Sequence, residues 1–394
     1  MQTSPAGTVT RSTDTHGVPL GIADPVERAR FVAPAIRAAA AEVESNGTMT
    51  DDVVNLLTEA ELFWLLAPTE VGGGGAEITQ ALAVTEEISA ADGSIGWSLM
   101  ANMSVTGFSG GHCAETAVDT LFRGSEKAII AGMFAPMGKV TEVEGGYRAG
   151  GRYQFGSGTG HASWIGGGAR TGANNEIELI FMVPREQVEF LGNWDVLGLV
   201  GTGSYDYEIP QQFVSTDFTV QRTGAKPLRG QSTQHLGLQI MGSSGHAGVA
   251  LGIARRAFGE LHGILAAGKS RPGVLPIIEQ QLFQHDFAVM EGKLASARAF
   301  CFDVFDAAQQ SVNAGNEVSD LEYQRVRQAS TFVTGVAREA VEFAYAWSGS
   351  KGLRGPNALA RCVRDIHGAT QHVYVDPTTM VSAAPSVFAS YAEH

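Results

Sequence analysis

The sequence predicts an α+β fold in which a helical domain, a small β domain and a four-helix bundle follow one another. Three observations predict it: helical periodicity in the first third, short β-type runs between glycine turns in the middle, and long helical stretches at the end. At 394 residues the chain is long enough for two or three domains. We place the N-terminal helical domain at 23–126, the β domain at 127–225 and the bundle at 226–394, after a polar tail at 1–22.

Helical periodicity fills residues 24–66 and resumes at Ile78. Thr50 is a predicted N-cap, because two aspartates follow it and acidic residues favour the first turn of a helix. Four consecutive glycines, Gly72 to Gly75, separate the two helical regions. They lack the spacing of a phosphate-binding loop, so we expect a hinge or a close approach of backbones there.

The middle of the chain alternates β-type runs with glycine and asparagine turns. A hairpin is expected at Gly145-Gly146, and the stretch after Asn193 predicts two further strands. A β domain of roughly 90 residues is the size of a small barrel or sandwich, and we expect a small β-barrel. The clearest predicted strands are 129–130, 140–143, 147–155 and 177–183.

Three helical stretches begin near Leu238, Pro276 and Leu321. Each is about 30 residues long, which exceeds the usual length of a globular helix. Helices of this length predict a helical bundle.

Composition excludes several classes of protein. The net charge is −14, from 27 basic and 41 acidic residues, which argues against a nucleic-acid binder. No run of 18 apolar residues exists, so no membrane partner is expected. Cys113, Cys301 and Cys362 are isolated, which argues against a disulfide framework or a metal site. A cytoplasmic protein fits this cysteine usage.

Directional polar side chains concentrate in the segment from Leu353 to Pro377. It contains Arg361 and Arg364, an aspartate, and two histidines, His367 and His372, between apolar helical runs. Plain packing does not require so many polar groups, so we expect this segment to line a site.

Four motifs stand in the same order as in acyl-CoA dehydrogenase-type flavoproteins. They are AGMFAPMG, GRYQFGSGTGHASW, WDVLGLVGTGSYDY and AWSGSKGLRGPNALARCVRDIHGATQH. Through them the chain resembles that family over nearly its whole length outside the tail. The resemblance implies that the first two motifs contact a flavin. The candidate flavin-binding residues are Phe134, Ala135, Pro136, Ser157, Gly158, His161 and Trp164.

Two arginines are further candidates for flavin binding. Arg271 resembles the arginine that reaches the flavin phosphate of a neighbouring subunit in this family, which implies a homotetramer. An ordinary solvated loop arginine is the alternative. Arg364 either contacts the flavin or forms a structural ion pair with Asp365.

The family supports two kinds of reaction, and the residues distinguish them. An acyl-CoA dehydrogenase needs a carboxylate base, which most members carry in a Tyr-Glu-Gly-Thr motif. The corresponding stretch here, QHVYVDPTTM, lacks the motif, and a second possible stretch, SSGHAGVALG, offers only His246. The missing base argues against oxidation of an acyl thioester. An acyl-CoA dehydrogenase with an atypical base remains the alternative, and a non-catalytic flavin-fold protein a third possibility.

The chain resembles more closely the oxygenase components of two-component flavin-dependent monooxygenases. These enzymes take reduced FMN or FAD from a separate reductase and react with O2 through a C4a-hydroperoxyflavin. They oxygenate a small aromatic, heteroaromatic or heteroatom substrate. By this resemblance Ser157 lies near flavin N5 and His372 holds the peroxide proton, since an imidazole titrates near neutrality. Trp97 and His246 are expected to face the substrate pocket.

Two positions depart from this pattern. Relatives that hydroxylate phenols carry a histidine about two turns after the tryptophan corresponding to Trp97. The position here is near Val105, which argues against phenol activation and leaves a heteroaromatic ring or a heteroatom as acceptor. The arginine common before the GTGS sequence is Val200 here.

Overall fold

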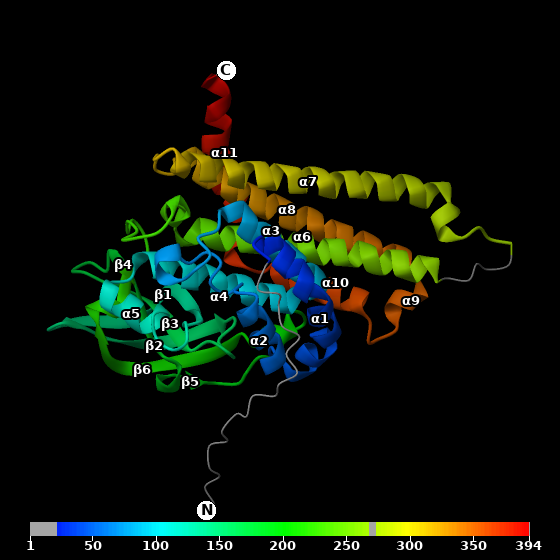
Figure 1. The fold of residues 1–394 in the computed structure, drawn as a ribbon. Helices are drawn as coiled ribbons and strands as arrows, with labels where there is room; N and C mark the ends of the chain where they lie inside the picture. Colours follow the sequence, from blue (N-terminus) through cyan, green and yellow to red (C-terminus); the bar gives the residue numbers. More distant parts are fainter. Residues whose placement is uncertain (1–21, 268–272, 394) are drawn as a thin grey trace, which may run out of the picture.

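The computed structural model describes residues 22–267 and 273–393, and its elements follow the predicted order of helices, strands and helices (Figure 1). The predicted tail, apart from residue 22, lies outside the described residues, and so does Arg271. None of the described helices is long and apolar enough to cross a membrane.

The N-terminal helices begin and end at identifiable capping residues. Thr50 caps α2 as predicted, with its side chain accepting from the backbone of Val53. The periodic stretch that begins at Ile78 is divided at Asp92, whose side chain caps a second helix. The bounds are α1 (Pro25–Asn46), α2 (Asp51–Glu59), α3 (Ile78–Ala91), α4 (Gly93–His112) and α5 (Glu115–Phe122).

The four-glycine stretch is a close approach of backbones, one of the two structures expected for it. A Cβ atom on Gly73 would lie 2.2 Å from the carbonyl oxygen of Ala67, and one on Gly74 2.8 Å from that of Leu65. Only glycine fits at these two positions.

The described strands form one seven-stranded sheet in the order β5-β6-β2-β1-β3-β4-β7. Only the β1–β3 pair is parallel. The bounds are β1 (Ile130–Val143), β2 (Gly146–Gly156), β3 (Trp164–Thr171), β4 (Ile177–Pro184), β5 (Glu189–Phe190), β6 (Tyr205–Ser215) and β7 (Thr219–Gln221).

The sheet is open, which corrects the closed barrel expected from its size. Its two edge strands, β5 and β7, are two and three residues long and pair only inward, with β6 and β4. The two predicted strands after Asn193 reduce to one, β6, and the segment before it is irregular. Conversely, the two short strands predicted at 129–130 and 140–143 are parts of the single long strand β1.

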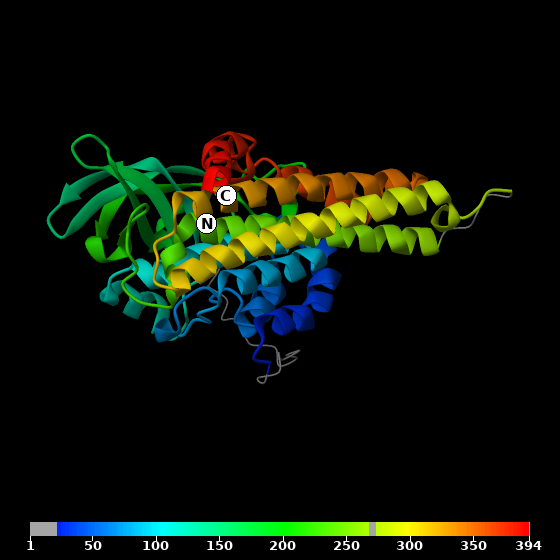
Figure 2. The ribbon, with the colours of Figure 1, turned by 90° about the horizontal axis from the view of Figure 1, so that it is seen from above.

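The three long helices are present and lie side by side (Figures 1 and 2). They are α6 with 30, α7 with 33 and α8 with 29 residues. Helix α3 packs along α6, because the glycines of α6 admit it closely. A Cβ on Gly252 would lie 2.5 Å from the carbonyl oxygen of Glu86. The bounds are α6 (Gly237–Ala266), α7 (Gln281–Asn313), α8 (Asp320–Ser348), α9 (Ser350–Leu353), α10 (Ala358–Ala369) and α11 (Thr378–Ala389).

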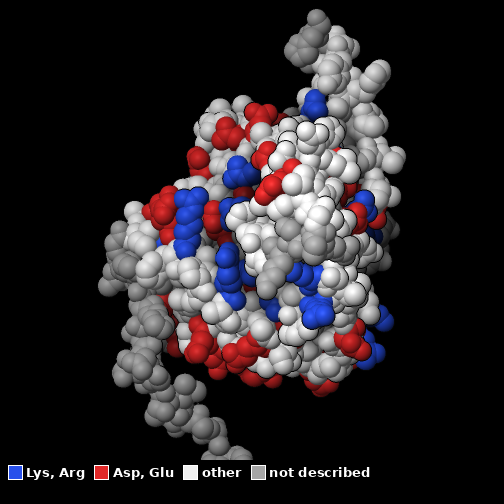
Figure 3. All heavy atoms as spheres, turned by 90° about the vertical axis from the view of Figure 1, so that its right-hand side faces the viewer, with Lys and Arg blue, Asp and Glu red and all other residues white. Residues whose placement is uncertain are grey.

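Charged side chains of both signs share the face drawn in Figure 3, with Asp and Glu bordering Lys and Arg.

Candidate active site

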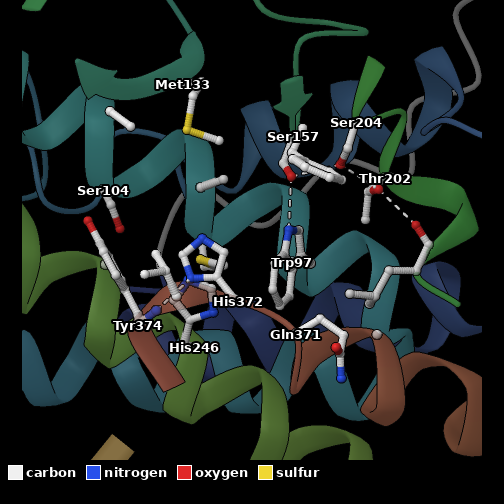
Figure 4. Close-up of a pocket in the computed structure, with 18 of the residues that line it drawn as sticks. Trp97, Ser104, Met133, Ser157, Thr202, Ser204, His246, Gln371, His372 and Tyr374 are labelled. Carbon is white, nitrogen blue, oxygen red and sulfur yellow. Dashed lines mark hydrogen bonds between the residues drawn. The ribbon is translucent and has the colours of Figure 1, made fainter. Parts of the chain in front are cut away.

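A cavity of about 840 Å³ lies where α4, β1, α6 and the segment after α10 meet (Figure 4). Apolar residues make up most of its lining, as in most small-molecule sites, and several polar side chains, including Arg222, also border it. Among the residues predicted from sequence, those that line the cavity are Trp97, Phe134, Ala135, Ser157, His246 and His372.

Other predicted residues do not line this cavity. His161 is half-buried, its Nε2 lies 2.9 Å from the side-chain oxygen of Asn102, and its ring packs on Phe63. Trp164 stacks on Phe218 at a centroid distance of 5.0 Å. Pro136 and Gly158 flank residues that do line it.

Ser157 follows directly after β2 in a tight turn, which places its hydroxyl at the cavity wall. Its Oγ accepts a hydrogen bond from Nε1 of Trp97 at 2.9 Å and lies 2.7 Å from Oγ of Ser204 (Figure 4). The serine therefore belongs to a turn and also lines the cavity.

His372 presents a defined nitrogen to the cavity. Its Nδ1 accepts a hydrogen bond from the backbone N–H of Tyr374 at 3.2 Å. In the neutral ring the proton must then be on Nε2. Burial lowers the pKa of His372 to about 4. The side chain is thus a neutral Nε2–H donor at pH 7, which corrects the expectation that it titrates near neutrality.

His246 stands beside His372, and their rings stack at 4.0 Å with 30° between planes. Burial lowers the pKa of His246 well below its ordinary value. Its Nδ1 has no hydrogen-bond partner among the described residues. Trp97 and Tyr374 pack edge-on against this pair, so four aromatic rings form one corner of the cavity.

Sequence reasoning did not single out Tyr374, Thr202 or Ser204 as site residues. All three line the cavity. A signal for two of them was present, because Thr202 and Ser204 lie in the quoted GTGS sequence.

The C-terminal part of the polar segment from Leu353 to Pro377 lines the cavity, with His367, Gln371 and His372 among the lining residues. Its helix α10 also supports the cavity wall from behind. Asp365 of α10 accepts a hydrogen bond from the backbone N–H of Leu199 at 2.7 Å, which holds the cavity-lining loop before β6. A Cβ on Gly198 would lie 2.0 Å from the carbonyl oxygen of Arg364, so helix and loop are in direct contact.

The suggested ion pair between Arg364 and Asp365 does not form. Arg364 instead pairs with Glu44 of α1 and does not line the cavity. Arg361 also pairs with Glu44, at 2.9 Å, and with the buried Asp92, at 3.4 Å. These arginines join α10 to the N-terminal helices.

Asp365 makes stability depend on pH in a specific direction. Burial and the neighbouring Asp92 raise the pKa of Asp365 to about 7 from an ordinary 3.8. The folded chain then retains a proton that the unfolded chain loses, so this group's contribution to stability falls as pH rises through that window. We expect Asp365→Asn to gain stability relative to the unmodified chain by at most about 1.4 kcal/mol per pH unit there.

Urea denaturation between pH 4 and 8 measures this difference. It should grow up to about pH 7 and then level off. The control is Asp376→Asn, since hydrogen bonds from Thr378 lower the pKa of that exposed carboxylate. Equal slopes for both variants would show that Asp365 titrates normally.

The residues at the cavity wall fit a flavin ring. Strand β1 pairs with β2 only from Lys139 onward, and its register with β3 jumps from Met133 to Pro136. Phe134 and Ala135 therefore have no ladder partner at the cavity wall. Unpaired backbone groups of this kind suit the polar edge of a heterocycle, and the apolar lining suits its faces.

Comparison with known proteins agrees with these features. Residues 26–109 match the N-terminal domain of acyl-CoA dehydrogenase, and residues 244–377 match its C-terminal domain. The chain is 30% identical over 361 residues to an indole-3-acetate monooxygenase of Pseudomonas putida, covering 89% of this chain and 90% of that protein. It is 26% identical over 367 residues to the flavin-dependent monooxygenase oxygenase subunit HsaA of Rhodococcus jostii, covering 89% and 94%.

Solved structures share the fold. The 3-HSA hydroxylase from a Rhodococcus species superposes with a TM-score of 0.85 at 23% identity, over 93% of this chain and 97% of that one. XiaF from a Streptomyces species, solved with FADH2 and glycerol, superposes with a TM-score of 0.86 at 20% identity, over 93% and 95%.

Proposed function

The chain belongs to the acyl-CoA dehydrogenase family, among its flavin-dependent monooxygenases, and on that premise we propose that it oxygenates a small heteroaromatic substrate of about the size of indole. It is the oxygenase component of a two-component system and uses reduced flavin from a separate reductase. The observation that carries the proposal is the cavity with its neutral His372 donor and aromatic corner.

The residues of this chain have distinct parts in the proposed reaction. Bound reduced flavin supplies the electrons that activate O2 for transfer of one oxygen atom. Phe134 and Ala135 hold the flavin ring through the unpaired part of β1. His372 donates a hydrogen bond from Nε2 to the oxygen that is to be transferred. The apolar walls exclude water, which otherwise promotes loss of hydrogen peroxide.

Two observations favour a heteroaromatic substrate over a phenol. Val105 lines the cavity. It lies near the position where, by the family resemblance, relatives that hydroxylate phenols carry a histidine. The aromatic rings of Trp97 and Tyr374 offer edges and faces against which a flat ring can pack. The name of the indole-3-acetate monooxygenase points to the same class of substrate.

With an indole-type substrate, we expect the amount of O2 consumed by the enzyme to match the amount of oxygenated product. The purified chain would be mixed with a flavin reductase, NADH and FAD or FMN, and given indole, indole-3-acetate or phenol. Product should gain one oxygen atom by mass spectrometry with an indole-type substrate and not with phenol. The proposal fails if all three substrates only produce hydrogen peroxide.

An assembly of four chains in the cytoplasm is also part of the proposal. Large apolar side chains stand exposed on α7 and on the projecting α11, among them Leu282, Val289, Val381 and Phe388. Such patches support contacts between subunits. The three cysteines are free and buried, which fits a reducing compartment. Light scattering after gel filtration measures the assembly.

A further inference from the structure

Four side chains that line the cavity form an oriented chain of hydrogen bonds. Trp97 Nε1 lies 2.9 Å from Ser157 Oγ, which lies 2.7 Å from Ser204 Oγ, and Ser204 Oγ lies 2.8 Å from Thr202 Oγ1. Thr202 Oγ1 donates to the carbonyl oxygen of Leu199 at 2.7 Å. Figure 4 shows the chain along one wall of the cavity.

Both ends of this chain determine its direction. An indole N–H can only donate and a carbonyl oxygen can only accept. Thr202 donates its one hydroxyl proton to the carbonyl oxygen of Leu199, so Ser204 must donate to Thr202. Ser204 then has no proton for Ser157, and Ser157 must donate to Ser204.

With the hydrogen bonds oriented in this way, Ser157 can form only one kind of hydrogen bond with a ligand. Its proton is committed to Ser204, and one lone pair accepts from Trp97. A second lone pair remains on a side chain that lines the cavity. Toward the cavity, Ser157 is therefore an acceptor of hydrogen bonds.

The far end of the chain is held in place by the helix behind it. The carbonyl oxygen of Leu199 belongs to a residue with φ of 56°. The N–H of the same residue donates to the buried Asp365. The carbonyl oxygen of Leu199 is therefore fixed as the final acceptor, and the orientation of the hydrogen bonds is fixed with it.

We propose that this chain, from Trp97 to the carbonyl of Leu199, makes the cavity prefer reduced over oxidised flavin. The inference rests on the proposed function and on the family resemblance, which implies that Ser157 lies near N5 of the flavin ring. Oxidised N5 carries no proton and needs a donor, whereas reduced N5 carries a proton and needs an acceptor. Oriented by these hydrogen bonds, Ser157 can bond only to the reduced form. The oxygenase would therefore release oxidised flavin after turnover and bind reduced flavin in its place.

Equilibrium binding of both redox forms tests the proposal without any turnover. Dissociation constants would be measured for oxidised flavin in air and for reduced flavin under anaerobic conditions. In Thr202→Val and Ser204→Ala the hydroxyl of Ser157 is free to rotate and donate. We expect the preference for reduced flavin to fall about threefold to tenfold, the size of one hydrogen bond. Tenfold corresponds to about 30 mV in the two-electron potential of bound flavin.

A matched pair of variants separates direction from packing. Thr202→Ser retains the donating hydroxyl and should keep the preference of the unmodified chain. Thr159 also donates to a carbonyl oxygen three residues earlier, that of Gly156, at 2.7 Å, and is buried but does not line the cavity. Thr159→Val removes an equivalent bond and should leave the preference unchanged.

The outcomes are distinct. An unchanged preference in Thr202→Val and Ser204→Ala overturns the inference, and so does an equal loss of affinity for both redox forms. Failure of the unmodified chain to bind either form would instead count against the proposed function. A weaker preference for reduced flavin in Thr202→Val and Ser204→Ala, but not in Thr202→Ser or Thr159→Val, supports the inference.

Discussion

Replacing His372 by alanine is expected to lower the rate of product formation by about 100-fold while oxidation of the flavin continues and hydrogen peroxide accumulates. Proton donors positioned in an active site contribute at least this factor. The backbone N–H of Tyr374 keeps Nδ1 occupied, so the ring offers Nε2–H to the cavity. Without that donor the activated oxygen is lost to water rather than transferred. The ratio of product to NADH consumed measures the effect.

Two companion variants identify which property of the ring matters. His372→Phe keeps the aromatic packing against Trp97 and His246 and removes the donor. It should lose as much product as the alanine variant. His372→Gln retains an N–H donor and should keep part of the coupling. If phenylalanine preserves coupling, the ring serves packing alone and the donor role is wrong.

The pH dependence of coupling follows from the same side chain. Because burial depresses the pKa of His372 to about 4, the ring is neutral above about pH 5. Coupling attributable to it should therefore be flat between pH 6 and 9. An inflection near pH 6.5 that disappears in His372→Phe would contradict this expectation.

The fold was predictable where local patterns determine it. The helix caps, the β1–β2 hairpin and the three long helices follow from short stretches of sequence. Closure of the sheet was not predictable, because it depends on whether two edge strands far apart in sequence meet. Here β5 and β7 are two and three residues long and do not pair with each other.

The site was predictable as a set of segments and not as a set of side-chain directions. His161 lies four residues from Ser157, yet its ring turns away to Asn102 across the turn after β2. Arg364 and Asp365 are neighbours on a helix, and successive residues there point in different directions. They accordingly contact Glu44 and Leu199. Sequence shows neither direction.

The ion-pair cluster behind the site leads to the second large effect. Arg361 →Met should destabilise the chain by about 3–5 kcal/mol, the usual cost of leaving a buried charge without its partner. The Arg361 side chain is 14% exposed, and its guanidinium is the shared counter-charge of Glu44 and of Asp92, whose side chain is 2% exposed. Asp92 cannot turn to solvent, because its other oxygen caps α4 through Ile95. Methionine keeps most of the volume and removes only the charge.

Two further variants decide whether charge is the cause. Arg30 lies on α1 and pairs with Glu27 and Glu87, but is 54% exposed, so Arg30→Met should cost only about 0–1 kcal/mol. Adding Glu44→Gln to Arg361→Met removes one of the stranded carboxylates and should restore part of the loss. Denaturation midpoints of the four proteins measure this. If the double variant is no more stable than Arg361→Met, the loss comes from packing between α10 and α1 rather than from the unpaired carboxylates.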